Sequence, residues 1–198
     1  MSSHPNGTPM TEKEKAANGW LYDANYDKEL LDERLQAKKL LYQYNLIPPG
    51  KEKERMTLLQ KLLGKCPEEL NIEPPFYCDY GYNIEIGNHF FANMNLVILD
   101  GAKVTLGENV FIAPNVSLYT AGHPFSVKQR NAGLEYAYPI HIGDNVWIGG
   151  NVVILPGVTI GDNCVIGAGS IVTGDIPANT VAYGNPCRVV RSLTKEEI

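Results

Sequence analysis

The sequence lacks any long apolar run and has few cysteines. No apolar stretch approaches the roughly 20 residues that a membrane-spanning helix needs, and the amino terminus, MSSHPNGTPMTEKEK, lacks the apolar core of a secretory signal. We therefore expect no membrane partner and a cytoplasmic location. The four cysteines, Cys66, Cys78, Cys164 and Cys187, show no C-x-x-C spacing, which favours reduced, structurally inert thiols over a disulfide framework.

The chain also lacks an excess of positive charge. Its formal net charge is −5 over 198 residues, so it has no overall attraction for phosphates, and nucleic acid is not expected as a partner. An anionic ligand would need a local basic cluster. Glycine (19) and proline (13) are abundant instead, which favours a turn-rich β architecture over a helical bundle. The length suits one sizeable domain with a modest appendage.

The amino-terminal part predicts helices. We expect a disordered segment over 1–10 and a helical segment over 11–70. Apolar residues recur at three- and four-residue steps in DKELLDERLQAKKLLYQYN, as in an amphipathic helix, at Leu30, Leu31, Leu35, Leu41 and Tyr42. Asp27 should cap this helix, because a carboxylate stabilises the exposed N–H groups of a helix start. IPPG at 47–50 ends it, and KEKERMTLLQKLLG predicts a second helix closed by Gly64.

A six-residue repeat dominates the carboxyl-terminal half. Aliphatic residues fall every six positions at Ile142, Ile148, Ile154, Ile160, Ile166 and Val172. Two positions earlier the same step gives Ile140, Val146, Val152, Val158, Cys164 and Ser170. Because GDN, GGN and LPG interrupt the pattern with turn residues, we expect short strands joined by tight corners. Three such edges make a triangular coil whose inward aliphatic residues stack on the next coil.

An earlier copy of the repeat passes through Ile86, Ala92 and Ile98 and, after a shift, through Leu106, Ile112 and Leu118. The register is then lost in TAGHPFSVKQRNAGLEYAYP, which we interpret as a loop over about 119–139 that leaves the coil. The coil as a whole is predicted over 71–180. Residues 181–198 lose the repeat and are expected to form a terminal cap, because the last coil would otherwise expose its apolar end.

Several motifs together resemble the galactoside and maltose O-acetyltransferases, which are hexapeptide-repeat acyltransferases. These motifs are YCDYGYNIEIG, ANMNLVILDGA, LYTAGHP, NVWIGGNVVILPGVTIGDNCVIGAGSIVT and GNPCRV. The repeat alone indicates only the superfamily, whereas CDYG, AGHP and GNPCRV together are more specific. The resemblance covers residues 11–192. It implies a mainly β fold, a left-handed parallel β-helix with an N-terminal helical segment and an extruded loop, and a homotrimer.

The resemblance also implies roles for individual residues. His123 matches the catalytic base, and Asn93 matches an active-site asparagine that contacts both acceptor and acetyl donor. Asp79 and Asp100 fall at or beside positions that contact the acceptor, and Asp23 is our choice for an acidic acceptor contact from the amino-terminal segment. Positions that contact acetyl-CoA in the family are matched by Trp147, Gly150, Ala168, Thr173, Arg188 and Arg191. Gly174 departs from the family pattern, which commonly has a lysine there.

Acetyl transfer to a sugar hydroxyl needs a base, because a hydroxyl that keeps its proton is a poor nucleophile. Histidine exchanges a proton near neutral pH and is suited to this task. We expect His123 to take the proton as the hydroxyl oxygen attacks the acetyl carbonyl directly, since the matched motif contains no nucleophilic serine or cysteine. The alternative for a lone histidine after a strand is a loop residue bonded to a nearby carbonyl.

Other residues also have structural alternatives. Asn93 could be a corner residue, because asparagine tolerates the left-handed backbone of tight turns. Trp147 could cover an apolar edge, and Arg188 and Arg191 could be solvated charges. His89, His123 and His141 lack the H-x₄-H pair of the zinc-binding β-helix carbonic anhydrases, so no metal is expected. We expect His141 to face outward and His89 to lie at a corner.

The predicted function is therefore acetyl-CoA-dependent O-acetylation of a sugar of the maltose, glucose or galactoside type. One alternative is an acetyltransferase for another small hydroxyl acceptor on the same coil, which the helical segment and CDYG disfavour. A second alternative is a non-catalytic β-helix that serves as a binding subunit, which the presence of His123 and Asn93 disfavours.

Overall fold

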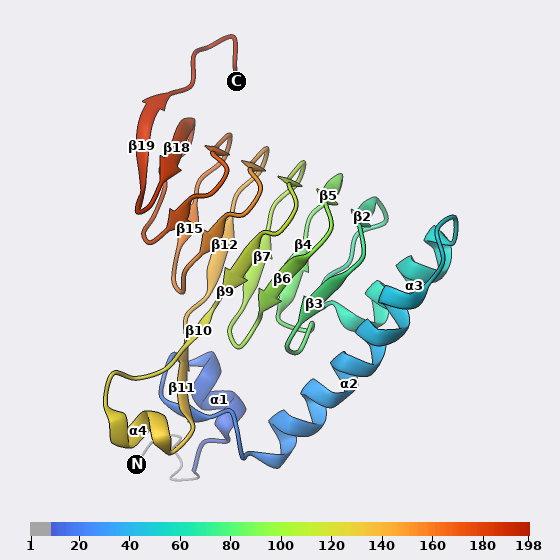
Figure 1. Ribbon diagram of the computed structural model, residues 1–198, viewed down its shortest axis with the longest axis vertical. Helices are drawn as coiled ribbons and strands as arrows, with labels where there is room; N and C mark the ends of the chain where they lie inside the picture. Colours follow the sequence, from blue (N-terminus) through green and yellow to red (C-terminus); the bar gives the residue numbers. More distant parts are fainter. Residues whose placement is uncertain (1–8) are drawn as a thin grey trace.

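The computed structural model describes residues 9–198 and shows a stacked β coil with helices at its amino-terminal end (Figure 1). The elements before the coil are α1 (Glu12–Ala17), β1 (Tyr22–Asp23), α2 (Lys28–Leu46) and α3 (Glu52–Leu62). Of the segment 1–10 that was predicted to be disordered, only Pro9 and Met10 lie within the described residues. None of the helices within residues 9–198 is long and apolar enough to cross a membrane.

The coil has three faces, each a sheet in which parallel strands come from successive coils, except that the last strand of the second face, β19, is antiparallel. One face holds β4 (Ile84–Ile86), β7 (Val104–Leu106), β12 (Ile140–Ile142) and β15 (Thr159–Ile160). A second face holds β2 (Leu70–Ile72), β5 (Phe90–Ala92), β8 (Phe111–Ile112), β13 (Trp147–Ile148), β16 (Val165–Ile166), β18 (Thr180–Gly184) and β19 (Cys187–Ser192). The third face holds β3 (Phe76–Cys78), β6 (Leu96–Leu99), β9 (Ser117–Tyr119), β14 (Val153–Ile154) and β17 (Ile171–Val172). The predicted mainly β, parallel β-helical fold is confirmed.

The interior of the coil is the aliphatic column that the six-residue step predicts. Every residue of the main series from Ile142 to Val172 is at most 1% exposed, and Ile86, Ala92, Ile98, Leu106, Ile112 and Leu118 are equally buried. Parallel pairing places Ile154 between Leu118 and Val172, so each side chain stacks on its counterpart one coil away. Full burial of an aliphatic side chain contributes about 1.5–3 kcal/mol, and the contributions accumulate along the column.

Asparagines turn the corners of the coil. Asn95, Asn109, Asn115, Asn145, Asn151, Asn163 and Asn179 all have φ between 54° and 63°, the left-handed region that asparagine tolerates better than most residues. Their side chains also bond from coil to coil: Asn145 Nδ2 donates to Asn163 Oδ1 at 3.0 Å, and Asn163 Nδ2 donates to Asn179 Oδ1 at 2.7 Å. His89 takes the same corner conformation, with φ 56°, as predicted.

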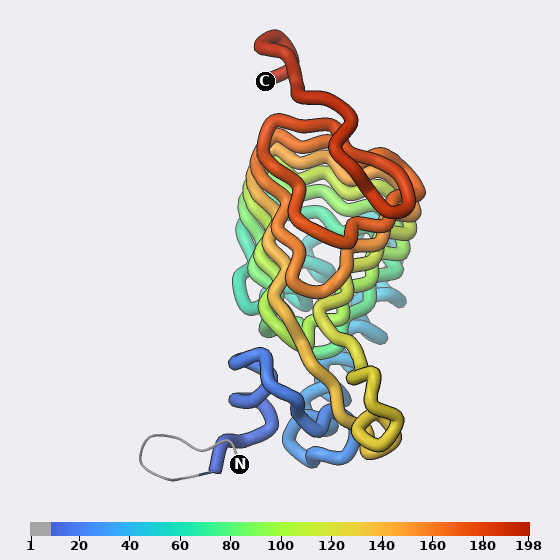
Figure 2. The backbone as a smooth tube through the Cα atoms, turned by 90° about the vertical axis from the view of Figure 1, so that its left-hand side faces the viewer, coloured from blue at the N-terminus to red at the C-terminus, as the bar shows by residue number. Residues whose placement is uncertain are grey.

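The extruded segment is a hairpin that projects from the coil beside the amino-terminal elements (Figures 1 and 2). It comprises β10 (Ala121–Gly122), α4 (Val127–Asn131) and β11 (Leu134–Ala137). β11 pairs antiparallel with β10 on one side and with β1 on the other, so a separate three-stranded sheet forms. The amino-terminal segment is therefore joined to the hairpin through backbone hydrogen bonds.

The helices α2 and α3 cover the first coil. Leu41 and Tyr44 of α2 and Leu59 and Leu62 of α3 are buried in the same core as the first strands. Asp27 caps α2 as predicted: its Oδ1 accepts a hydrogen bond from the Leu30 N–H at 3.0 Å. The predicted apolar face of α2 is only partly buried. Leu31, Leu35 and Tyr42 are 42%, 49% and 69% exposed, because the face of α2 that packs on the coil runs through Leu30, Ala37, Leu41 and Tyr44.

Gly64 does not close the second helix. α3 ends at Leu62, with Leu63 as an extended cap, and the Gly64 N–H donates to Ile84 O at 3.0 Å and to Gly81 O at 3.2 Å. A Cβ at this position would lie 2.1 Å from Tyr82 O. Glycine is required here because the chain enters the first coil against another backbone segment, so the prediction of a helix-capping role was wrong.

The carboxyl-terminal cap is a hairpin. β18 extends the parallel ladder by pairing with β16, and β19 turns back antiparallel to it. Cys187 is buried beneath this hairpin, while the rest of β19 is exposed. The parallel ladder thus continues through Ala182 rather than ending at 180, because Val181 and Ala182 of β18 pair with β16 one coil below.

Two glycine substitutions test the packing at the coil entrance. Gly64→Ala should lower the free energy of unfolding by about 1–3 kcal/mol, as overpacking does elsewhere. Gly174→Ala is the control, because a Cβ there would meet nothing within 4 Å. Urea unfolding of the two variants checks this, and equal stability of both would contradict the packing explanation.

Candidate active site

His123 lies directly after β10, at the base of the projecting hairpin. Its Nδ1 is 3.1 Å from the carbonyl oxygen of Leu134 on β11. Because a carbonyl oxygen can only accept, this contact requires the proton to be on Nδ1, which leaves the lone pair of a neutral ring on Nε2. The ring is half exposed, at 49%. The loop alternative and the catalytic prediction are thus compatible: the carbonyl bond orients the ring, and about half of the side chain stays exposed.

Glu135 faces the free nitrogen of His123, with Oε1 3.8 Å from Nε2. The carboxylate is 16% exposed, and Tyr22 and Asn25 of the amino-terminal segment also approach it, with Tyr22 Oη 3.3 Å from Oε2 and Asn25 Nδ2 3.4 Å from Oε1. Sequence reasoning missed this residue. It lies where the six-residue register is lost, and only the pairing of β11 with β1 and β10 reveals its neighbours.

Asp79 follows β3 and lies half buried between the coil and α2. Burial raises the pKa of Asp79; Arg34 lowers it, Glu135 raises it further and Lys38 lowers it. The Arg34 guanidinium donates to Ala24 O and lies 5.8 Å from the ring centre of Tyr80. Asp79 lines a polar groove of about 410 Å³ together with Asn25, Leu31, Arg34, Leu35 and Lys38. Carboxylate and cationic groups in such a groove can hold the hydroxyls of a polar ligand.

Asp100 is not exposed to a ligand. Its side chain is completely buried, and both of its oxygens accept backbone hydrogen bonds, from Asp79 N at 3.0 Å, Tyr80 N at 2.9 Å and Gly81 N at 2.7 Å. The prediction that Asp100 contacts the acceptor is corrected: these N–H groups occupy the carboxylate, and no surface is left for a substrate.

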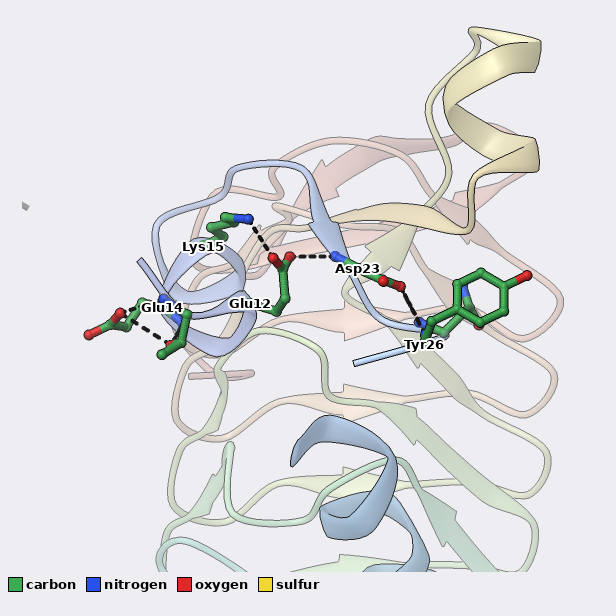
Figure 3. Close-up of polar contacts among 7 residues, drawn as sticks. Glu12, Glu14, Lys15, Asp23 and Tyr26 are labelled. Atoms are coloured by element: carbon green, nitrogen blue, oxygen red, sulfur yellow. Dashed lines mark hydrogen bonds and ion pairs between the residues drawn. The ribbon is translucent and has the colours of Figure 1, made fainter. Parts of the chain in front are cut away.

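Asp23 lies on β1, opposite Leu134 of β11. Figure 3 shows its carboxylate turned toward the Tyr26 N–H, which donates to Oδ1 at 2.9 Å, while its own N–H donates to Glu12 Oε2 at 2.6 Å. Asn25 N also donates to Oδ1, at 3.1 Å. The structure thus places Asp23 next to the hairpin as a turn-forming residue, and its contact with an acceptor stays a prediction.

Asn93 lies at a different corner from His123. It follows β5, and its Oδ1 accepts a hydrogen bond from the Met94 N–H at 2.8 Å. Asn93 is thus a corner residue, as the structural alternative has it, but the left-handed residue of this corner is Asn95. Gly150 and Ala168 lie near the same edge of the coil, after β13 and β16. The third face, whose strands are two to four residues long, separates this edge from the one that carries Asp79 and His123, by about 13 Å for four extended residues.

The residues expected to bind acetyl-CoA are only partly brought together. Trp147 and Arg191 line one groove of about 600 Å³ with Asn145, Asn163, Val165, Val181, Leu193, Glu197 and Ile198. Within it Arg191 forms two bonds to Glu197, at 2.7 and 2.8 Å. Arg188 is exposed, with Nη1 donating to Cys187 O at 2.8 Å, and does not line this groove. Thr173 follows β17 and lies at the edge of the third face that carries Asp79 and His123, not at the edge that carries Gly150 and Ala168.

The remaining candidate ligands for a metal are dispersed. His141 is exposed on β12, as predicted, and His89 pairs with Glu69. Within residues 9–198 no three His, Cys, Asp or Glu side chains are grouped so that they could hold a metal ion. All four cysteines carry free thiols, and burial raises the pKa of Cys66, Cys78 and Cys187, so these thiols are poor nucleophiles.

A coil of hexapeptide repeats with a histidine on a projecting hairpin defines a hexapeptide acyltransferase. A family model described as "Maltose acetyltransferase hexapeptide capping motif" matches residues 15–67, and one described as "Bacterial transferase hexapeptide (six repeats)" matches residues 139–174. A putative acetyltransferase of Saccharomyces cerevisiae is 59% identical over 184 residues, covering 93% of this chain and 94% of that protein.

Solved structures agree with these matches. A maltose O-acetyltransferase from Clostridium difficile 630 has a TM-score of 0.92 and 52% identity, covering 94% of this chain and 99% of that one. A galactoside acetyltransferase in complex with coenzyme A has a TM-score of 0.91 and 48% identity, covering 95% of this chain and 94% of that one. The chain belongs to the galactoside and maltose O-acetyltransferase family, and the expectation of an acetyltransferase enzyme is confirmed.

The buried carboxyl of Asp100 makes stability depend on pH in a defined direction. Burial raises the pKa of Asp100 from 3.8 to about 6, although the Tyr80 and Gly81 N–H groups oppose the shift. The folded protein therefore holds this proton more tightly than the unfolded chain. The stability that this tighter proton binding adds to the folded state is fully present below a pH of about 3.8, and it is lost as the pH rises through about 6. Urea unfolding at several pH values should show a steeper loss for wild type than for Asp100→Asn; parallel profiles would contradict the shift.

Proposed function

We propose that this enzyme transfers the acetyl group of acetyl-CoA directly to a hydroxyl of a neutral sugar, with His123 as the general base. The observation that carries the proposal is the orientation of His123: the bond from Nδ1 to Leu134 O leaves Nε2 as the basic atom of a half-exposed ring. Relatives with this fold are named as maltose and galactoside acetyltransferases, and one was solved with coenzyme A. These similarities support the donor and the class of acceptor.

In the proposed reaction, the sugar hydroxyl gives its proton to Nε2 of His123 while its oxygen attacks the thioester carbonyl carbon. The carbonyl electrons move to oxygen and form a tetrahedral oxyanion. When this collapses, the bond from carbon to sulfur breaks, and the coenzyme A sulfur takes the proton from the imidazolium. The Glu135 carboxylate lies 3.8 Å from Nε2, close enough for a Coulombic attraction to the imidazolium that forms transiently.

The acceptor side combines carboxylates, an amide and two cationic groups with the side chains of Leu31 and Leu35. Asp79, Glu135 and Asn25 can each bond a hydroxyl, and Arg34 and Lys38 limit the negative charge around Asp79. A neutral polyhydroxylated ring suits these groups, because ionised carboxylates accept hydrogen bonds from several hydroxyls. Glucose, maltose and galactosides all fit this description, and a panel of sugars is needed to rank them.

The donor side supports a homotrimer. Asn93, Gly150 and Ala168 lie at one edge of the third face, whereas His123 lies at the other, so one chain does not bring the predicted catalytic pair together. A ring of three copies would place the hairpin of one copy over the opposite edge of its neighbour, because head-to-tail contacts close under threefold rotation. In this arrangement each active site is shared between two copies, with acetyl-CoA held along the edge that carries Asn93.

Acetyl-CoA-dependent thiol release with a sugar panel tests the function, and His123→Ala tests the base. The wild type should release thiol with at least one sugar, and the variant should turn over about 10²- to 10⁴-fold more slowly, the usual contribution of a general base. His141→Ala, an exposed histidine outside the site, should match the wild type. Turnover of His123→Ala within tenfold of the wild type would exclude the proposed base.

The basic residues of the carboxyl-terminal hairpin give a second test. Arg188→Ala with Arg191→Ala should raise the KM for acetyl-CoA about tenfold or more, since a hydrogen bond to a charged group contributes about 1.5–3 kcal/mol. Lys61→Ala on α3 removes one positive charge elsewhere and should leave this KM unchanged. An unaltered KM in the double variant would show that these arginines do not meet the phosphates of coenzyme A.

A further inference from the structure

Two buried polar residues occupy the same row of neighbouring coils. Asp100 lies two residues beyond Ile98, and Thr120 lies two residues beyond Leu118, and parallel pairing aligns Ile98 with Leu118. Both side chains are completely buried. Continuing the register through Ile154 and Val172 places Pro156 and Gly174 in this row in the later coils. The fold therefore does not require polar side chains here, although burying one is costly unless it is fully bonded.

Asp100 holds the turn that carries Asp79. The N–H groups of Asp79, Tyr80 and Gly81 converge on its two carboxylate oxygens at 2.7–3.0 Å. Gly81 is in the left-handed region, with φ +81°, and a Cβ there would lie 2.5 Å from Leu62 Cδ1. In addition, Asn83 Nδ2 donates to Asp100 O at 2.7 Å. The backbone on both sides of Asp79 is thus tied to the next coil.

Thr120 holds the root of the His123 hairpin. Its hydroxyl donates to Leu99 O at 2.6 Å and accepts from Ala102 N at 2.9 Å. Its backbone closes the hairpin base, because its carbonyl accepts from Tyr138 N at 2.9 Å while its own N–H donates to Leu99 O at 3.1 Å. These bonds hold the backbone on both sides of Asp100, because Leu99 directly precedes it and Ala102 follows two residues later.

We propose that Asp100 and Thr120 are positioning residues for acetyl transfer: together they fix the acceptor carboxylate of Asp79 and the base His123 relative to each other. The proposal rests on the function proposed above. Neither residue touches the reacting atoms. Their bonds form one continuous path from the 79–81 turn, through residues 99–102, to the two strands that leave and re-enter the coil at the hairpin. Displacement of a reacting group by about 1 Å can lower a rate about 100-fold. A continuous path of bonds that prevents such a displacement therefore preserves the rate.

The first test compares two carboxylates that make the same kind of bond. Asp100→Asn keeps the size of the side chain but turns an NH₂ group toward a backbone N–H. The acceptor KM should rise about tenfold, with the KM for acetyl-CoA unchanged. Asp144→Asn is the matched control, because Asp144 Oδ1 accepts from Glu108 N of the neighbouring coil at 2.8 Å, away from the site. The Asp144→Asn variant should have a lower free energy of unfolding than the wild type but the same KM values.

The second test does not depend on whether Asp100→Asn folds. Thr120→Val removes the hydroxyl at nearly constant volume and should lower kcat about tenfold, because it loosens the root of the hairpin that carries His123. Thr120→Ser restores the hydroxyl and should recover most of kcat. Equal impairment of the two Thr120 variants would overturn the proposal, as would wild-type kinetics in Asp100→Asn.

Amide hydrogen exchange separates this proposal from the function on which it rests. If the wild type acetylates no sugar, the proposed function fails. The positioning role is then decided by exchange at residues 79–81 and 121–123, which should be faster in Asp100→Asn and Thr120→Val than in wild type and Asp144→Asn. Unchanged exchange at these residues would overturn the positioning role, whatever the substrate is.

Discussion

Stacking of each coil on its neighbour is the constraint on which the rest of the molecule depends. The inward aliphatic residues and the backbone hydrogen-bond ladders both repeat from one coil to the next, so every coil fixes the height and rotation of its neighbour. Asparagines in left-handed conformation allow this step to repeat without strain at the corners. The result is a rigid scaffold along which residues distant in the sequence keep fixed separations, as Asp79 after β3 and His123 after β10 do.

The amino-terminal segment completes the candidate site in addition to covering the first coil. β1 adds a third strand to the hairpin sheet, and Tyr22 and Asn25 approach the Glu135 carboxylate beside His123. α2 supplies Arg34 and Lys38 to the groove around Asp79. The groove around Asp79 is therefore complete only when this segment packs on the coil.

Much of this organisation can be predicted from the sequence, because the six-residue step records a contact made one coil away. The buried column, the extruded segment, the cap at Asp27 and the position of His123 all follow from local pattern or motif. Glu135 could not be found this way, since its contact with Tyr22 spans 113 positions and depends on strand pairing. Asp100 shares the motif that suggested a ligand contact, but burial gives it another role. Leu31, Leu35 and Tyr42 obey helical periodicity, yet α2 packs through Leu30, Ala37, Leu41 and Tyr44 instead.

The closed base of the hairpin has a consequence for how this enzyme can change. Thr120 and Tyr138 are bonded to each other across the base, so the coil advances from β9 to β12 as if the intervening residues were a single corner. The length and composition of the excursion are thereby uncoupled from the register of the stack. Insertion, deletion or exchange within this one segment can therefore alter the surroundings of His123 while the stacked coils keep their register.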